Sequence, residues 1–190
     1  MNAYPVAAII LAAGASTRLG SPKQLIRLGS ETLLERTVRI AIEAGLAPVY
    51  GVVSANLPSG ACYRPMIRVL NTEASEGMAS SIRAGLRAAE SGPPPLPGIV
   101  MLTCDQPAVT AKHLRELARG GADVIASAYA QRKGVPAYFP ASVFPQLRAL
   151  RGDVGARELL KAARAIDLPG GELDIDTPGD LEQALRMYST

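Results

Sequence analysis

The sequence has few cysteine and histidine residues and lacks long apolar segments. Its two cysteines, Cys62 and Cys104, are too far apart for the spacing of a zinc knuckle. The longest apolar stretch, residues 6–13, is much too short to cross a bilayer and is typical of a buried strand. The N-terminal segment has neither the basic region nor the cleavage pattern of a signal peptide. We therefore expect a reducing, cytoplasmic location and no membrane partner.

A basic run is also missing. The 20 basic and 17 acidic residues are spread along the chain and give a net charge of +3, so we expect no nucleic-acid partner. Any local excess of positive charge would suit a small anionic ligand. The 190 residues, of which 48% are hydrophobic, are enough for one α/β domain, and we assign a single domain to residues 1–190.

Short runs rich in Val, Ile and Leu alternate with segments of helical period, a pattern that predicts an α/β fold with a mostly parallel central sheet. We expect strands at residues 6–11, 49–53, 66–70, 98–103 and 123–128, the first of them central. Helices are expected from Ser30 to Gly45, over 78–91, from Thr110 to Gly120 and from Pro178 onward. The Gly- and Pro-rich residues 130–160 indicate loops and short helices over one face.

The loop after the first strand carries the chemistry of a nucleotide site. Ala12, Ala13 and Gly14 leave the backbone accessible to a flat ligand, and Arg18 and Lys23 add positive charge for phosphates. The glycines fit neither a Rossmann GxGxxG fingerprint nor a Walker A loop. An ordinary turn with surface cations remains the alternative for this loop taken alone.

Two aspartates follow predicted strands or precede predicted helices. Asp105 ends the run GIVMLTCD, and Asp176 lies just before the helix that begins near Pro178. In an open parallel sheet, ligands bind beyond the carboxyl ends of the strands, so both aspartates are candidates for one site with the first loop. A turn role for Asp105 and a helix-end role for Asp176 are the alternatives.

The motif LAAGASTRLGSPKQ, residues 11–24, resembles the signature LAAGxSxRxGxxKQ of the molybdenum cofactor cytidylyltransferases and related MobA-like NTP transferases. Later blocks resemble that family in the same order and extend the resemblance over almost the whole chain. They are EGMASSIRAGL, TCDQP, KGVPAYF, GDVGARELL and DIDTPGDL. The resemblance implies a Rossmann-like three-layer sandwich of the nucleotide-diphospho-sugar transferase type.

The resemblance also implies roles for individual residues. The backbone of Ala12, Ala13 and Gly14 would contact the nucleotide, together with Gly77 and Ser81 near the base and ribose. Arg18 and Lys23 would hold the triphosphate, and Asp105 and Asp176 would bind Mg²⁺, a hard cation usually held by one or two carboxylates plus phosphates and water. Arg18, Lys23 and Asp105 would be the catalytic groups. Residues that would line the acceptor side are Lys133, Gly134, Pro136, Asp153 and Arg157.

The implied reaction is transfer of CMP from CTP to molybdopterin with release of pyrophosphate, with a molybdoenzyme as the client of the product. CTP is preferred because related guanylyl enzymes resemble LAGG where this chain has LAAG. Two alternatives stay open: a cytidylyl- or uridylyltransferase that acts on a sugar phosphate or methylerythritol phosphate, and a non-catalytic cofactor-binding accessory protein for a molybdoenzyme. The single histidine, His113, has no Cys or His partner nearby in the sequence and is expected to have a surface or helix-end role.

Overall fold

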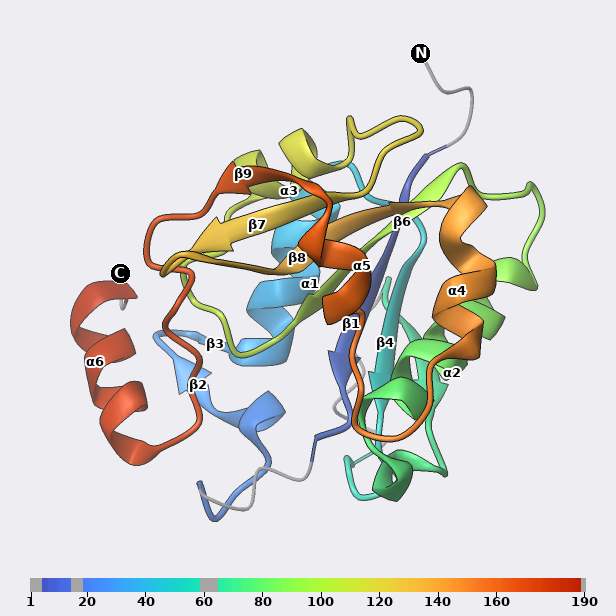
Figure 1. The fold of residues 1–190 in the computed structure, drawn as a ribbon. Helices are drawn as coiled ribbons and strands as arrows, with labels where there is room; N and C mark the ends of the chain where they lie inside the picture. Colours follow the sequence, from blue (N-terminus) through green and yellow to red (C-terminus); the bar gives the residue numbers. More distant parts are fainter. Residues whose placement is uncertain (1–4, 15–18, 59–64, 189–190) are drawn as a thin grey trace.

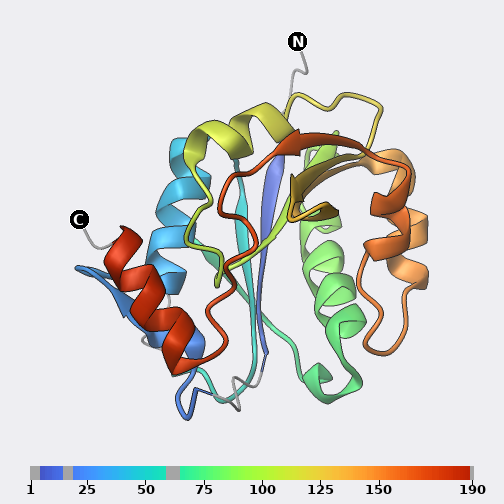
Figure 2. The ribbon, with the colours of Figure 1, turned by 60° about the vertical axis from the view of Figure 1, so that its left-hand side comes forward.

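The fold is a sheet covered by helices on both faces, seen in a computed structural model that describes residues 5–14, 19–58 and 65–188 (Figures 1 and 2). In Figure 2, α1 (Leu33–Glu43) and α3 (Ala111–Leu117) lie on one face of the sheet. The opposite face is covered by α2 (Met78–Glu90), α4 (Phe144–Ala149) and α5 (Arg157–Lys161). This arrangement confirms the predicted three-layer α/β sandwich.

The main sheet has seven strands in the order β5-β4-β1-β6-β8-β7-β9. Their bounds are β1 Ala7–Ala12, β4 Val49–Val53, β5 Ile67–Leu70, β6 Gly98–Thr103, β7 Ile125–Tyr129, β8 Arg132–Pro140 and β9 Arg164–Asp167. Only β8 runs antiparallel to its neighbours, so the sheet is mostly parallel as predicted. β1 is an interior strand, and β6 rather than β1 takes the middle position.

Alternation along β1 divides the core into two layers. Ala8 and Ile10 pack on the α1 and α3 side, and Ala7 and Ile9 pack on the α2 and α4 side. All four side chains are fully buried. Because successive residues of a strand face opposite sides of the sheet, the continuous apolar run of β1 is what a strand covered on both faces requires.

One expectation about local structure was wrong, and one strand was not predicted. Residues 132–140 were expected to form loops, yet they form β8, which pairs with both β6 and β7 although it contains Gly134 and Pro136. The register of the β7–β8 pair shifts between Ala126 and Ser127, and this irregularity accommodates a proline inside the sheet. The short strand β9 beyond α5 was also missed.

The start of α1 differs from the prediction as well. Thr32, not Ser30, caps the helix: its Oγ1 accepts from the Glu35 backbone N–H at 3.1 Å, and the Glu35 carboxylate accepts from the Thr32 backbone N–H at 2.6 Å. The residues before it form a small hairpin of β2 (Arg27–Leu28) and β3 (Glu31–Thr32). That hairpin lies beside the last helix, α6 (Pro178–Tyr188), in Figure 1.

Candidate active site

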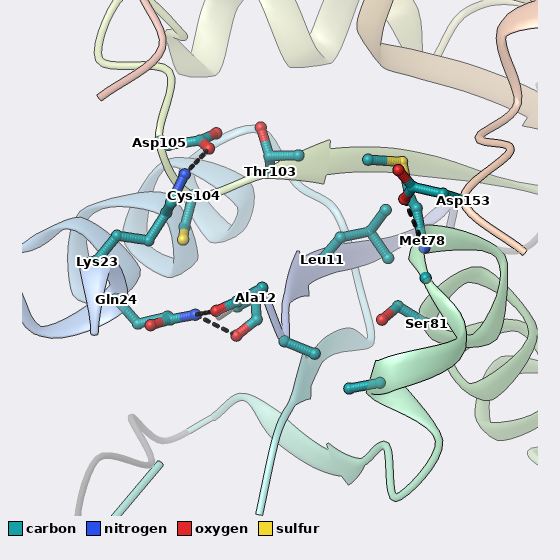
Figure 3. Close-up of a pocket in the computed structure, with 14 residues that line it drawn as sticks. Leu11, Ala12, Lys23, Gln24, Met78, Ser81, Thr103, Cys104, Asp105 and Asp153 are labelled. Atoms are coloured by element: carbon teal, nitrogen blue, oxygen red, sulfur yellow. Dashed lines mark hydrogen bonds and ion pairs between the residues drawn. The ribbon is translucent and has the colours of Figure 1, made fainter. Parts of the chain in front are cut away.

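A cavity of about 340 Å³ opens where β1 and β6 end, a volume in the range of small-molecule pockets. Figure 3 shows its walls. Its lining residues are Leu11, Ala12, Ala13, Gly14, Lys23, Gln24, Ala74, Gly77, Met78, Ser81, Thr103, Cys104, Asp105 and Asp153. Because parallel strands end at one edge of a sheet, segments distant in the sequence meet here.

The backbone of the first loop is held in place by Gln24. This side chain is buried, and its Nε2 donates to the Ala12 carbonyl at 2.5 Å and to the Gly14 carbonyl at 3.4 Å. Ala12 and Ala13 are themselves buried against the sheet, and Gly14 is exposed. The sequence pattern predicted no role for Gln24, although this residue closes the LAAGASTRLGSPKQ motif. Arg18, the other predicted cation of this loop, lies outside the described residues.

Lys23 brings the two predicted metal carboxylates together. Its Nζ lies 2.7 Å from Asp105 Oδ2 and 2.6 Å from Asp176 Oδ1. Burial disfavours the charge of the ammonium group, but the charges of Asp105 and Asp176 and their hydrogen bonds outweigh burial and raise the pKa of Lys23 above its usual value. Lys23 is therefore a permanent cation at neutral pH.

The backbone explains why residues 105 and 176 meet. The Ile175 N–H donates to the Asp105 carbonyl at 2.9 Å, and the fully buried Ile175 side chain anchors this segment in a small core beneath α6. Gln106 adds a second tie, since its Nε2 donates to the Gly171 carbonyl at 3.0 Å. Asp176 then leads into α6, where Thr177 and Asp180 form a reciprocal cap at the start of the helix predicted from Pro178.

The charge around this point suits a divalent cation. Two carboxylates already point at one positive charge, the Lys23 ammonium. A third acid, Asp174, lies close by: burial and the charge of Asp105 raise its pKa to about 6, although Arg132 opposes that shift. Among the described residues, no group of three or more His, Cys, Asp or Glu side chains is arranged to hold a metal ion. A bound cation would therefore take most of its ligands from phosphates and water, as Mg²⁺ usually does.

The opposite wall is the N-terminus of α2 and the loop that packs on it. Gly77 has φ +115°, and a Cβ there would lie 2.7 Å from the Asp153 backbone. The Met78 N–H donates to Asp153 Oδ1 at 3.4 Å, and the Ala79 N–H donates to the Gly152 carbonyl at 3.1 Å. This contact brings Asp153 into the cavity wall beside Ser81.

The other predicted acceptor residues do not line this cavity. Lys133 donates from Nζ to the carbonyls of Lys161 and Ala163, at 3.0 and 2.7 Å, and so ties β8 to the end of α5 and the residues that follow it. Gly134 packs against the Tyr129 ring, the Pro136 carbonyl accepts a hydrogen bond from Ser127, and Arg157 begins α5 on the surface. Their binding roles stay predictions.

His113 and Cys104 have structural surroundings. His113 is in the first turn of α3, which agrees with the helix-end alternative rather than the surface one, because its side chain is buried and its Nε2 lies 2.7 Å from Ser127 Oγ. Burial lowers the pKa of His113, which favours the neutral ring. Burial also raises the pKa of the Cys104 thiol, so this side chain is a poor nucleophile although it borders the cavity.

An open α/β sheet with a small-residue loop, a lysine and paired carboxylates at its carboxyl edge defines a protein of the nucleotide-binding class. Residues 8–167 match the MobA-like NTP transferase domain. The chain belongs to this family of nucleotidyltransferases, whose members bind an NTP and a phosphorylated acceptor. This assignment confirms the family resemblance seen in the sequence.

Individual relatives are similar over different lengths. The purine catabolism protein PucB of Bacillus subtilis is 33% identical over an alignment of 202 residues, gaps included. The alignment covers 95% of this chain and 96% of PucB. A probable molybdenum cofactor guanylyltransferase of Opitutus terrae is 33% identical over 118 residues, or 62% of this chain and 56% of that protein. A crystal structure of Rv0371c from Mycobacterium tuberculosis in complex with manganese has a TM-score of 0.75 and 28% identity, covering 96% of this chain and 98% of that one.

No helix in the described part of the chain is both long and apolar enough to span a bilayer.

Proposed function

We propose that this protein transfers the CMP moiety of CTP to molybdopterin and releases pyrophosphate. The observation that carries the proposal is the convergence of Asp105 and Asp176 on Lys23, in direct continuity with the small-residue loop 12–14. The cavity thus has Lys23 and Asp105 at one end, while Asp153 is the charged residue among those that line the other wall. A nucleoside triphosphate has the matching division between phosphates and nucleoside.

In the proposed reaction, a phosphate oxygen of the acceptor attacks the α-phosphorus of CTP. The bond from the α-phosphorus to the bridging oxygen breaks, and pyrophosphate takes the electron pair. The acceptor is already an anion, so no protein base is needed. Lys23, a permanent cation, would hold the phosphates in line and neutralise charge on the leaving group.

Asp105 and Asp176 would hold Mg²⁺, which when bound supplies further neutralisation of phosphate charge. Both side chains are carboxylates that already share one cationic partner. The manganese complex of Rv0371c supports a divalent ion in a similar fold. Arg18 would add a second phosphate-binding cation from the first loop.

The choice of CTP rests on Ala13, which is buried in the cavity wall. Related guanylyl enzymes resemble LAGG in this motif, with glycine at the position of Ala13. GTP is the rival, supported by the similarity to the guanylyltransferase of Opitutus terrae. One methyl group contributes only about 1–3 kcal/mol of discrimination, so the other walls must also select. Ala13→Gly is expected to shift competition between CTP and GTP toward GTP; a wild-type preference for GTP would refute the choice of CTP.

A second candidate is an accessory role in the maturation of a molybdoenzyme, without turnover. The near-complete coverage of PucB, a protein named for purine catabolism, favours a role beside a purine-degrading enzyme. The test is a pyrophosphate-release assay that crosses the four NTPs with molybdopterin, molybdenum cofactor, sugar phosphates and methylerythritol phosphate. Release only with CTP and a pterin supports the proposal. Release with another acceptor replaces it, and pterin binding without release supports the accessory role.

A further inference from the structure

Asn71, just beyond β5, is a buried polar residue behind the cavity wall. Its Oδ1 accepts a hydrogen bond from the Glu73 backbone N–H at 3.0 Å. Its Nδ2 donates to Ser80 Oγ at 2.9 Å and to Ser81 Oγ at 3.0 Å. Because a backbone N–H can only donate, the contact with Glu73 decides which end of the amide is oxygen. The amino group must therefore face the two serines.

This orientation determines the direction of both hydroxyl groups. Each serine oxygen accepts from Asn71, so each hydroxyl proton is available for donation elsewhere. Ser80 donates its proton to the Gly77 carbonyl at 2.8 Å. That carbonyl also accepts from the Ser80 backbone N–H at 3.2 Å and has little capacity left for Ser81. Ser80 therefore completes its bonding inside the protein.

Ser81 differs because it lines the cavity. Among the described residues, its hydroxyl accepts from Asn71 and donates to no protein group. Figure 3 shows Ser81 on the α2 side, across the cavity from Lys23 and Asp105. The Ser81 hydroxyl thus presents a hydrogen-bond donor at the end of the cavity away from Lys23 and Asp105.

We propose that Asn71 is a positioning residue that fixes Ser81 as a donor to an acceptor atom of the bound nucleoside. This inference rests on the proposed nucleotide function. The acceptor atom would be an oxygen or a ring nitrogen with a free lone pair, and either the pyrimidine base or the ribose can supply one. The buried amide favours such an atom because its amino group donates to the Ser81 oxygen and cannot accept the hydroxyl proton, which is left for the ligand.

The test inverts the polarity of residue 71. Asn71→Asp keeps the shape and still accepts from the Glu73 N–H, but its second oxygen would accept the Ser81 proton and leave serine lone pairs facing the cavity. Calorimetry with CTP should show an affinity loss of about three- to tenfold, as for one neutral hydrogen bond. Ser81→Ala should lose a similar factor. Ser80→Ala, which removes a matched partner of Asn71 outside the cavity, should leave CTP affinity within about twofold.

The double variant separates positioning from a general effect of charge or stability. In the Ser81→Ala background, Asn71→Asp should change CTP affinity little, because Asn71 acts through Ser81. An equal loss in both backgrounds, or unchanged binding by Asn71→Asp, overturns the inference. If thermal melting shows that the Asn71→Asp variant is not folded, Asn71→Ala is used instead. It must then lower CTP affinity in the wild-type background and change it little in the Ser81→Ala background.

Substrate analogues identify the acceptor atom. If the Ser81→Ala loss disappears with 2′-deoxy-CTP, the ribose 2′ oxygen is the acceptor; if it persists with 2′- and 3′-deoxy-CTP, the base is. Either result supports the inference. Wild-type protein that binds no NTP refutes the proposed function itself, and the inference with it. If the wild-type protein binds CTP but the effects of Asn71→Asp and Ser81→Ala on CTP affinity are independent, only the role of Asn71 is refuted.

Discussion

At the residue scale, Lys23 connects the first loop to the acidic edge of the sheet. Its side chain is 14% exposed and contacts Asp105, which is 16% exposed. Groups this shielded interact more strongly than surface ion pairs, and removing one partner leaves the others poorly compensated. Sequence reasoning identified all three residues but not their mutual contact, because a lysine predicted to bind phosphate gives no signal that it also contacts carboxylates.

Replacing Lys23 by Met should weaken NTP binding much more than nucleoside binding. A hydrogen bond to a charged group contributes about 1.5–3 kcal/mol, so CTP affinity should fall about 10- to 150-fold. Cytidine affinity should change less than about threefold, since no phosphate is present. The measurement is calorimetry, and Lys161→Met is the matched control because that surface lysine pairs only with the exposed Glu158 side chain among the described ion pairs. Similar losses for cytidine and CTP would remove the phosphate role.

Replacing Asp105 or Asp176 by Asn should abolish most metal-dependent turnover. Each change keeps the size of the side chain and removes its charge, and kcat should fall at least about 100-fold if the carboxylate holds a shared ion in the transition state. The double variant should lose much less than the product of the single effects, as groups that act as a unit are non-additive.

Asp123→Asn, on the exposed turn before β7, is the control for that series and should retain full activity. Mn²⁺ binding followed by electron paramagnetic resonance gives a readout that does not depend on turnover. Two Asn variants with unchanged rates and unchanged Mn²⁺ affinity would show that these carboxylates serve only as partners of Lys23.

At the element scale, short segments rather than whole helices shape the cavity. Gly77 lets the chain turn into α2 while the loop at residues 152–153 packs directly on it. The contact is reinforced by Arg83, which donates to the Leu150 carbonyl at 2.7 Å and pairs with Glu76 at 2.5 Å. The hydrogen bonds donated by Arg83 and by the Gly152 backbone N–H hold the pKa of Glu76 below its usual value.

Gly77→Ala should loosen this wall and destabilise the protein. A φ of +115° costs an alanine about 1–3 kcal/mol, and the added Cβ would meet the Asp153 backbone at 2.7 Å. We expect a loss of at least about 2 kcal/mol in urea unfolding, with weaker CTP binding. Gly92→Ala is the control, because its Cβ would meet only Tyr50 Oη, at an ordinary 3.7 Å. Equal stability of the two variants would contradict the packing role.

Helices and strands were predictable from the sequence where a single local pattern, such as an apolar run or a capping residue, pointed to one structure. β4 and β6 match their apolar runs residue for residue, Thr110 caps α3 as expected, and α6 begins at Pro178 as expected. β8 was not predictable, because Gly134 and Pro136 signal a loop locally while pairing with β6 and β7 on both sides overrides that signal. Thr32 rather than Ser30 caps α1 because a capping box needs a Glu or Gln three residues after the cap, and Glu35 stands three residues after Thr32.

At the scale of the whole molecule, the topology creates the site from residues that no local motif connects. Lys23, Asp105 and Asp176 come from the first loop, the end of β6 and the approach to α6. The sequence could indicate that strand ends meet at one edge, so the candidate site was largely predictable. It could not indicate that residues 132–140 lie within the sheet. Lys133, Gly134 and Pro136 do not line this cavity, and their role on the acceptor side stays a prediction.

The same topology predicts how ligand binding affects unfolding. A nucleotide in the cavity would contact segments from the start, middle and end of the chain, and it would bind only the folded protein. At a CTP concentration 100 times its Kd, the native state gains about 2.7 kcal/mol, which for a chain of this length raises Tm by roughly 5–10 °C. Cytidine at the same concentration should raise Tm much less, because it leaves Lys23 without a phosphate partner.

Adding Mg²⁺ to CTP should raise Tm further in the wild type, and the increment should vanish in the Asp105→Asn, Asp176→Asn double variant. Mg²⁺ without nucleotide should have little effect, since two carboxylates already shared with Lys23 supply few of the oxygen ligands that the ion needs. Scanning calorimetry measures all of these shifts, with Asp123→Asn expected to follow the wild type. A Mg²⁺ increment that survives in the double variant would place the ion elsewhere, whereas loss of the CTP shift itself would mean that the carboxylates support nucleotide binding only by holding Lys23 in position.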